Sequence, residues 1–165
     1  MKKQCMVLLV ENNSGVLTRV ASLFTQRGFN IDSLTVSPTE NPKLSRITIM
    51  TTGDQKTFSQ IMKQTNKLVE SKLIFSVEPA FSLIRENLLV KFPIDSEYTE
   101  EIKKAIYDFN AKILDMTNGC FVVELTDSPQ KIDDFLEVVE KFEIIEMCRS
   151  GAIAMERGNI SYDIN

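Results

Sequence analysis

The stretch "ENNSG", residues 11–15, places two asparagines, a serine and a glycine directly before a segment in which apolar residues recur at helical spacing. A turn of this composition begins a helix, and the first backbone N–H groups of a helix have no partner within it. These groups, together with the positive end of the helix dipole, attract carboxylates and phosphates. Gly15 lets a ligand approach the backbone, so this opening turn is a candidate anion-binding site.

The composition of the opening turn favours a free amino acid over a phosphate. The turn has no lysine or arginine and neither the GxGxxG nor the GxxxxGK[ST] phosphate-binding pattern. The helix N–H groups can bind a carboxylate, while the side-chain carbonyl of Asn12 can accept a hydrogen bond from an ammonium group. The alternative is that residues 12–15 only cap the helix, because Asn and Ser are common N-cap residues.

The overall composition argues against several other functions. The 165 residues include no histidine, so the commonest general base and the commonest metal ligand are missing. A net charge of −4 and the absence of a Lys/Arg run argue against a nucleic-acid partner. No apolar run approaches the ~18 residues of a membrane span and no signal-peptide pattern is present, so we expect a cytoplasmic protein without membrane contact. The three cysteines are expected to be buried small apolar residues.

The chain carries the element order strand, helix, strand, strand, helix, strand twice. Leu8-Leu9-Val10 matches Leu88-Leu89-Val90, and Phe29-Asn30 matches Phe109-Asn110, both at an offset of eighty residues. In the first copy we expect strands at 5–10, 30–36, 46–52 and 73–78, and helices at 15–27 and 55–67. In the second we expect strands at 88–92, 112–116, 121–125 and 144–149, and helices at 97–110 and 130–142.

This order predicts an α+β fold of two tandem ferredoxin-like domains, residues 1–79 and 80–165. Each should be an antiparallel sheet with both helices on one face. Asn118-Gly119 predicts a tight hairpin in the second copy, whereas the corresponding hairpin of the first copy is longer and contains Pro38 and Pro42. The other face of each sheet is apolar and uncovered, so pairing of sheets or chains is expected.

Two long stretches resemble one known family. "ENNSGVLTRVASLFTQRGFNIDSLTVSPTENPKLSRITI" is similar to the opening ACT domain of the small regulatory subunits of acetolactate synthase, also called acetohydroxyacid synthase. "KIDDFLEVVEKFEIIEMCRSGAIAMERG" resembles the closing helix, strand and Arg-Ser-Gly tail of the same family. Together the two resemblances extend over nearly the whole chain.

The resemblance implies a non-catalytic subunit in the biosynthesis of valine, leucine and isoleucine. Such a subunit dimerises through its ACT domains, activates the catalytic large subunit of acetolactate synthase and confers feedback inhibition by valine. Thiamine diphosphate, Mg and FAD are expected on that partner, and no cofactor or metal on this chain. The implied valine contacts come from two protomers. One protomer contributes Asn12, Gly15, Val16 and Leu17, and the other contributes Asn30 and Ile31. Of these, Val16, Leu17 and Ile31 are expected to surround the valine side chain.

Two alternatives remain at this point. The chain could be an ACT-type amino-acid sensor that regulates a different metabolic enzyme, or a small catalyst on a ferredoxin-like fold. The absence of histidine and of a basic phosphate loop argues against the catalyst. Co-purification of a thiamine-diphosphate enzyme would distinguish the acetolactate synthase subunit from another sensor.

Overall fold

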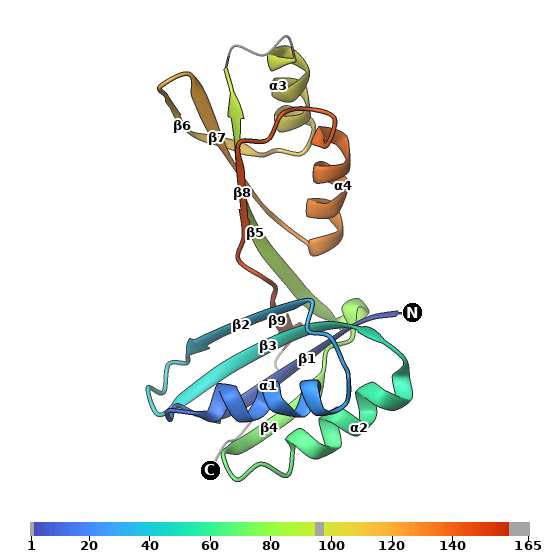
Figure 1. The fold of residues 1–165 in the computed structure, drawn as a ribbon. Coiled ribbons are helices and arrows are strands. Elements are labelled where there is room, and N and C mark those ends of the chain that lie inside the picture. The colour runs from blue at the N-terminus through green and yellow to red at the C-terminus, as the bar shows by residue number, and fades with distance from the viewer. Residues whose placement is uncertain (1, 95–97, 159–165) are drawn as a thin grey trace. The chain divides into compact units, whose positions relative to one another are not determined.

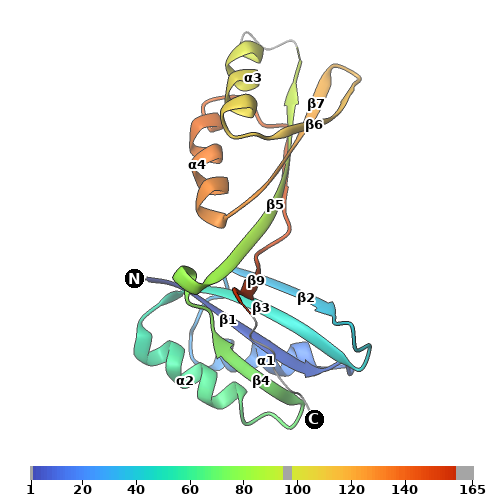
Figure 2. The same cartoon turned by 180° about the vertical axis from the view of Figure 1, so that it is seen from behind.

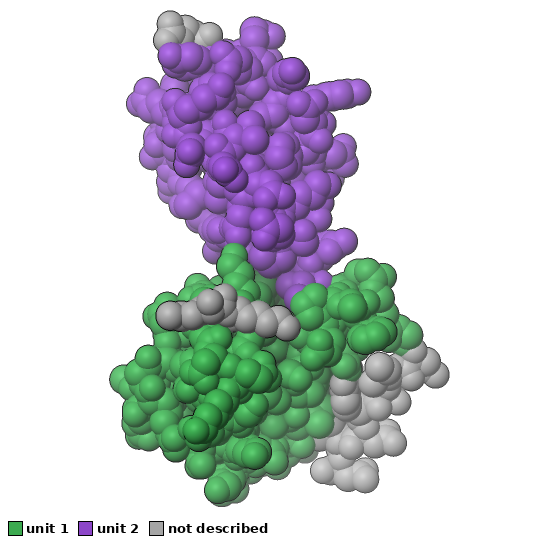
Figure 3. Space-filling model, turned by 90° about the vertical axis from the view of Figure 1, so that its right-hand side faces the viewer, with its two compact units in different colours: residues 1–83, 152–165 green, residues 84–151 purple. Residues whose placement is uncertain are grey.

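A computed structural model describes residues 2–94 and 98–158 and divides the chain into two compact units (Figures 1 and 3). Unit 1 comprises residues 1–83 and 152–165, and unit 2 comprises residues 84–151. The elements of unit 1 are β1 (Lys2–Glu11), α1 (Val16–Gln26), β2 (Ser33–Pro38), β3 (Leu44–Gly53), α2 (Gln55–Thr65), β4 (Ser71–Ser76), the short 3-10 helix η1 (Pro79–Phe81) and β9 (Ile153–Glu156). Strand β5 (Ser82–Pro93) enters unit 2, which continues with α3 (Thr99–Asp108), β6 (Lys112–Thr117), β7 (Cys120–Asp127), α4 (Pro129–Val139) and β8 (Glu146–Arg149).

In unit 1 an antiparallel sheet of order β2-β3-β1-β4 has α1 and α2 on one face (Figures 1 and 2). The helix-facing side of β1 presents Met6, Leu8 and Val10, which lie in the core with Val20 and Phe24 of α1. These α1 residues are four apart and therefore lie on one side of the helix. Burial of that apolar stripe holds α1 on the sheet and fixes the position of the opening turn at its first residue.

The other face of this sheet is partly covered, contrary to the expectation that it is open. Cys5, Val7 and Leu9 point away from the helices and are nevertheless buried. The chain returns here after unit 2: Nη2 of Arg46 on β3 donates to the carbonyl oxygen of Ala154 at 2.6 Å, and both Ala152 and Ala154 are buried. Residues 152–158 therefore cover with their own small side chains a surface that we expected another sheet or chain to cover.

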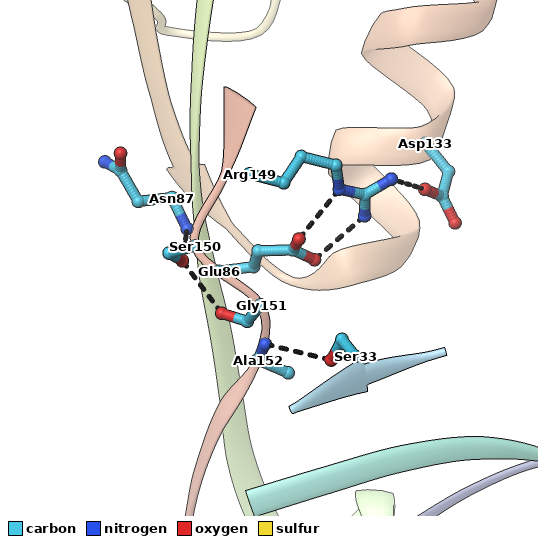
Figure 4. A network of polar contacts seen from close by, with 8 residues as sticks. All are labelled: Ser33, Glu86, Asn87, Asp133, Arg149, Ser150, Gly151 and Ala152. Carbon is cyan, nitrogen blue, oxygen red and sulfur yellow. Dashed lines mark hydrogen bonds and ion pairs between the residues drawn. The ribbon is translucent and has the colours of Figure 1, made fainter. Parts of the chain in front are cut away.

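The return of these residues also changes the domain division. The sequence predicted domains at 1–79 and 80–165, whereas the structure groups residues 152–158 with unit 1. The physical reason is a set of contacts with unit 1. The backbone N–H of Ala152 donates to Oγ of Ser33 at 3.4 Å (Figure 4). The backbone N–H of Arg157 donates to the carbonyl of Phe81 at 2.8 Å. Unit 2 is thus an insertion into unit 1.

Truncation after Gly151 is expected to make the Cys5 thiol reactive. Burial raises the pKa of this thiol to about 12, so it carries almost no reactive thiolate at neutral pH. Without residues 152–158 the thiol should regain solvent and react with Ellman's reagent faster by about ten-fold or more. Cys120→Ser and Cys148→Ser remove the other two signals.

Full-length Ala154→Glu is a second test, because it places a charge at a buried position of the same cover without shortening the chain. Circular dichroism should show that both variants keep their helices. An unchanged Cys5 labelling rate in both folded variants would show that residues 152–158 do not protect this face.

Unit 2 repeats the architecture of unit 1 with sheet order β6-β7-β5-β8, and α3 and α4 lie on one face (Figures 1 and 2). Leu88 and Val90 lie in its core as Leu8 and Val10 lie in that of unit 1. Asn118 and Gly119 have φ angles of 52° and 76°, as a type I′ hairpin turn requires. The predicted repeat of two ferredoxin-like βαββαβ arrangements is confirmed.

The predicted helices and strands are present with different ends. The helix expected at 97–110 begins at Thr99, and its predicted first residue, Glu97, lies outside the described residues. Strand β9 and helix η1 were not predicted. Of the cysteines, Cys5 is buried as expected, but Cys148 is exposed because it lies on the edge strand β8. None of the helices in the described part of the chain has the length and apolar composition that crossing a bilayer requires.

Arg149 holds β8 to β5 and α4 within unit 2 (Figure 4). Its Nε and Nη2 donate to the two carboxylate oxygens of Glu86 at 2.7 and 2.8 Å, and its Nη1 donates to Asp133 at 2.9 Å. The hydrogen bond with Glu86, more than that with Asp133, raises the pKa of the Arg149 guanidinium above its ordinary value. Because Glu86 is only 5% exposed, Arg149 supplies the charge that makes its burial tolerable.

Candidate functional site

The opening turn begins α1 without a side-chain cap. Gly15 is the N-cap residue and has φ +83° and ψ −8°, the left-handed conformation that favours glycine. By contrast, α2 and α4 are capped by the side chains of Asp54 and Ser128, and the hydrogen bonds from Thr57 hold the pKa of Asp54 below its usual range. The hypothesis that the asparagines and serine of the opening turn cap α1 is therefore wrong, and the helix start receives no side-chain cap from the described residues.

The asparagines of the turn instead fix its backbone. Nδ2 of Asn12 donates to the carbonyl of Pro42 at 3.0 Å, and its backbone N–H donates to the carbonyl of Lys43 at 2.8 Å. Nδ2 of Asn13 donates to Oε2 of Glu11 at 2.9 Å. The opening turn is thereby attached to the β2–β3 hairpin, whose extra length and prolines the sequence had shown.

The structure brings a cation to the turn that the sequence analysis missed. A Cβ at Gly15 would lie 3.6 Å from Nη1 of Arg19, one helical turn later, and Arg19 also forms an ion pair with Glu70. A guanidinium beside an uncapped helix start adds to the attraction for a carboxylate. The spacing of four residues on a predicted helix was the signal that could have identified Arg19.

A cleft of about 540 Å³ adjoins the same turn on its hairpin side. Lys72 of β4 forms an ion pair with Glu11 across it at 2.6 Å. The cleft is lined by Glu11, Asn12, Asn13, Asn41, Pro42, Lys43, Leu44 and Lys72. Of the predicted site residues only Asn12 belongs to it, so the cleft and the helix start are neighbouring features that share one asparagine.

Val16 and Leu17 have different environments, although both were expected around an effector side chain. Val16 is 3% exposed and packs in the core of unit 1, so its side chain is not free to line a pocket. Its backbone N–H lies 3.4 Å from the carbonyl oxygen of Asn13. Leu17 is 40% exposed in the first turn of α1 and can contact a ligand with its side chain.

Asn30 and Ile31 lie beyond the other end of α1. Asn30 is exposed, its Nδ2 donates to Asp32 at 3.1 Å, and its carbonyl accepts from Oγ1 of Thr51 at 2.6 Å. Ile31 is half-buried against the core. The 11 residues of α1 span about 16 Å at 1.5 Å per residue, so one chain does not bring Asn30 to its own Gly15. The predicted residues thus form two groups at opposite ends of α1.

The fold and the opening turn place unit 1 in a recognised class, the ACT domains, and residues 6–70 match the family described as AHAS small subunit-like ACT domain. Residues 85–158 match the family described as small subunit of acetolactate synthase. The acetolactate synthase isozyme 3 small subunit of Escherichia coli is 39% identical over 158 residues, which is 95% of this chain and 97% of that protein. The chain belongs to the acetolactate synthase small-subunit family.

Further relatives match nearly the whole chain. The acetolactate synthase small subunit of Mycolicibacterium smegmatis is 39% identical over 151 residues, covering 92% of this chain and 89% of that one. The crystal structure of the acetolactate synthase small subunit from Thermotoga maritima superposes with a TM-score of 0.85 at 36% identity, covering 97% of this chain and 100% of that one. The chain is therefore a regulatory small subunit with an ACT domain, as the resemblance predicted.

Proposed function

We propose that this chain is a non-catalytic subunit that activates a thiamine-diphosphate-dependent catalytic subunit of acetolactate synthase and makes it sensitive to valine. The observation that carries the proposal is the start of α1, where Gly15 in the left-handed conformation leaves the helix without a side-chain cap. Such a start binds a carboxylate through backbone N–H groups. We expect the protein to act in the cytoplasm, where it would join the catalytic large subunit.

A two-fold contact along β2 would produce a site shared between two ACT domains. Strand β2 is an edge strand, so its outer side is available for antiparallel pairing with β2 of a second copy. In that pairing the Ser33 end of one strand lies opposite the Pro38 end of the other. The Pro38 end leads into the hairpin that holds Asn12. Asn30 and Ile31 of one copy would therefore approach the opening turn of the other.

The chemistry of this shared site fits valine. The uncapped helix start and Arg19 favour the carboxylate, and the carbonyl oxygens of the Asn12 and Asn30 side chains can accept from the ammonium group. Leu17 of one copy and Ile31 of the other supply apolar contacts for a branched side chain. No cofactor is assigned to this chain; thiamine diphosphate, Mg and FAD would be bound by the catalytic partner.

Addition of this chain is expected to increase acetolactate formation by the catalytic subunit, and valine should reverse the increase. Leucine and isoleucine should act more weakly but detectably, because one methylene in an apolar pocket changes binding by only ~1–3 kcal/mol. The measurement is acetolactate formation against the concentration of each amino acid. Equal turnover with and without this chain would refute the proposed activation, whereas activation without any valine response would refute the proposed effector site.

A further inference from the structure

The edge strand β6 of unit 2 has the features of an interaction surface. It is the outermost strand in the order β6-β7-β5-β8 (Figures 1 and 2). Every residue from Lys112 to Thr117 is exposed. Three of them are large and apolar, and Leu114 and Met116 are each 55% exposed. The outer N–H and C=O groups of an edge strand can pair with another strand, and exposed apolar side chains on such an edge favour a contact surface.

A bulge arranges the charges of this edge. The pairing of β6 with β7 shifts between Ile113 and Asp115, so that Lys112 lies opposite Glu124 and Asp115 lies opposite Val122. Residues three apart on a regular strand point to opposite faces. The bulge at Leu114 instead places Lys112 and Asp115 on the same face of the sheet, the face away from the helices. The outer edge thus carries one positive and one negative side chain side by side.

This charge pattern is complementary to itself. If two β6 strands pair antiparallel around a two-fold axis at Ile113, and the bulge keeps Leu114 of each copy out of the pairing, Lys112 of each copy lies opposite Asp115 of the other. A register moved by two positions would place Asp115 opposite Asp115, which like-charge repulsion disfavours. Only shifts of two positions keep the helix-covered faces of both sheets on the same side. Among the registers that remain, the charges favour the one in which Lys112 lies opposite Asp115.

We propose that β6 is a contact surface for β6 of a second copy of this chain, with Ile113 at the two-fold axis and two Lys112–Asp115 ion pairs beside it. The contact joins second units, whereas the pairing in the proposed function joins first units along β2. The two edges correspond, since β6 has in unit 2 the place that β2 has in unit 1. The proposal does not depend on valine or on the catalytic subunit.

Cysteine cross-linking tests the contact directly. Opposed residues of an antiparallel pair have Cβ atoms about 4.5–5.5 Å apart, so Ile113→Cys should form a disulfide between copies under mild oxidation. Cys120→Ser and Cys148→Ser provide the background, and Cys5 is buried. Tyr107→Cys is the matched control, because Tyr107 is 84% exposed but lies on α3. Cross-linking is a better measurement than the mass of the assembly. If two chains are already paired through unit 1, a further contact along β6 need not change that mass.

Charge reversal tests the register. Lys112→Asp in the Ile113→Cys chain should slow cross-linking by about ten-fold, because it places two carboxylates at each pair. Adding Asp115→Lys should restore the cross-linking rate. In this double variant the new carboxylate at position 112 still lies opposite Glu124 of its own hairpin. A restored rate would therefore not be due to a more stable hairpin. The proposal is overturned if Ile113→Cys cross-links no faster than Tyr107→Cys, if the double reversal fails to rescue a folded chain, or if the thiol is instead captured by an added catalytic subunit.

Discussion

Gly15→Asp is expected to abolish inhibition by valine while activation of the catalytic subunit persists. Aspartate places a carboxylate at the helix start that is proposed to bind the carboxylate of valine, so charge repulsion and occupied space act together. The left-handed φ of +83° adds backbone strain of about 1–2 kcal/mol for a residue with a Cβ. The Cβ itself fits, because its nearest neighbour is Nη1 of Arg19 at 3.6 Å. The measurement is acetolactate formation against valine concentration, with a thermal melt beside it.

Two further substitutions separate the causes. Gly15→Asn has nearly the size of aspartate without its charge and tolerates the left-handed conformation, so it should keep more of the valine response. Gly15→Ala carries the strain with the least added volume. If a folded Gly15→Asp chain is inhibited by valine as strongly as the wild type, the opening turn is only a connection between β1 and α1 and the proposed site is lost.

Arg149→Met is expected to destabilise unit 2 by about 3 kcal/mol. This value is the low end of the cost of leaving a buried charge unpaired, and we choose it because the Arg149 side chain is 31% exposed. The loss leaves the buried carboxylate of Glu86 without its two hydrogen bonds. Urea unfolding followed by tyrosine fluorescence can measure this effect in unit 2, which holds Tyr98 and Tyr107. A Tyr162→Phe background removes the remaining tyrosine.

Asp133→Ala is the control for Arg149→Met, since it removes only a partly exposed contact and should cost at most about 1 kcal/mol. Adding Glu86→Met to Arg149→Met should recover much of the stability, because an apolar pair leaves no buried charge. Unchanged unfolding of Arg149→Met would show that Glu86 finds another partner or solvent in the folded unit.

The repeat and most elements were predictable because they depend on local patterns. The apolar periodicity around Val20 and Phe24 specifies one buried helix face, and Leu88 and Val90 repeat the core positions Leu8 and Val10. Asn118-Gly119 could be recognised because few other residue pairs adopt two successive positive φ angles. The glycine of the opening turn was predicted for ligand access, but its left-handed conformation was visible only in the structure.

The features that sequence analysis missed depend on contacts between distant residues. Strand β9 is four residues long, and its inward side chain Ala154 gives little pattern of its own. It is held by pairing with β5 and by the hydrogen bond from Arg46, 108 positions earlier. The role of Val16 could not be decided from the sequence for a related reason, since helical periodicity placed Val16 both near the turn and on the core face. Burial decides between these two roles, and the core contains its side chain.

The insertion of unit 2 has a consequence for the order of synthesis on the ribosome. Strand β1 is made long before β9, and the whole of residues 84–151 lies between them. Until unit 2 has emerged, the nascent sheet of unit 1 therefore lacks the contacts that residues 152–158 make with Ser33, Arg46 and Phe81. Unit 2, whose described contacts lie within one continuous segment, can fold during that interval. The domain that is translated first is thus the one whose folding is completed last.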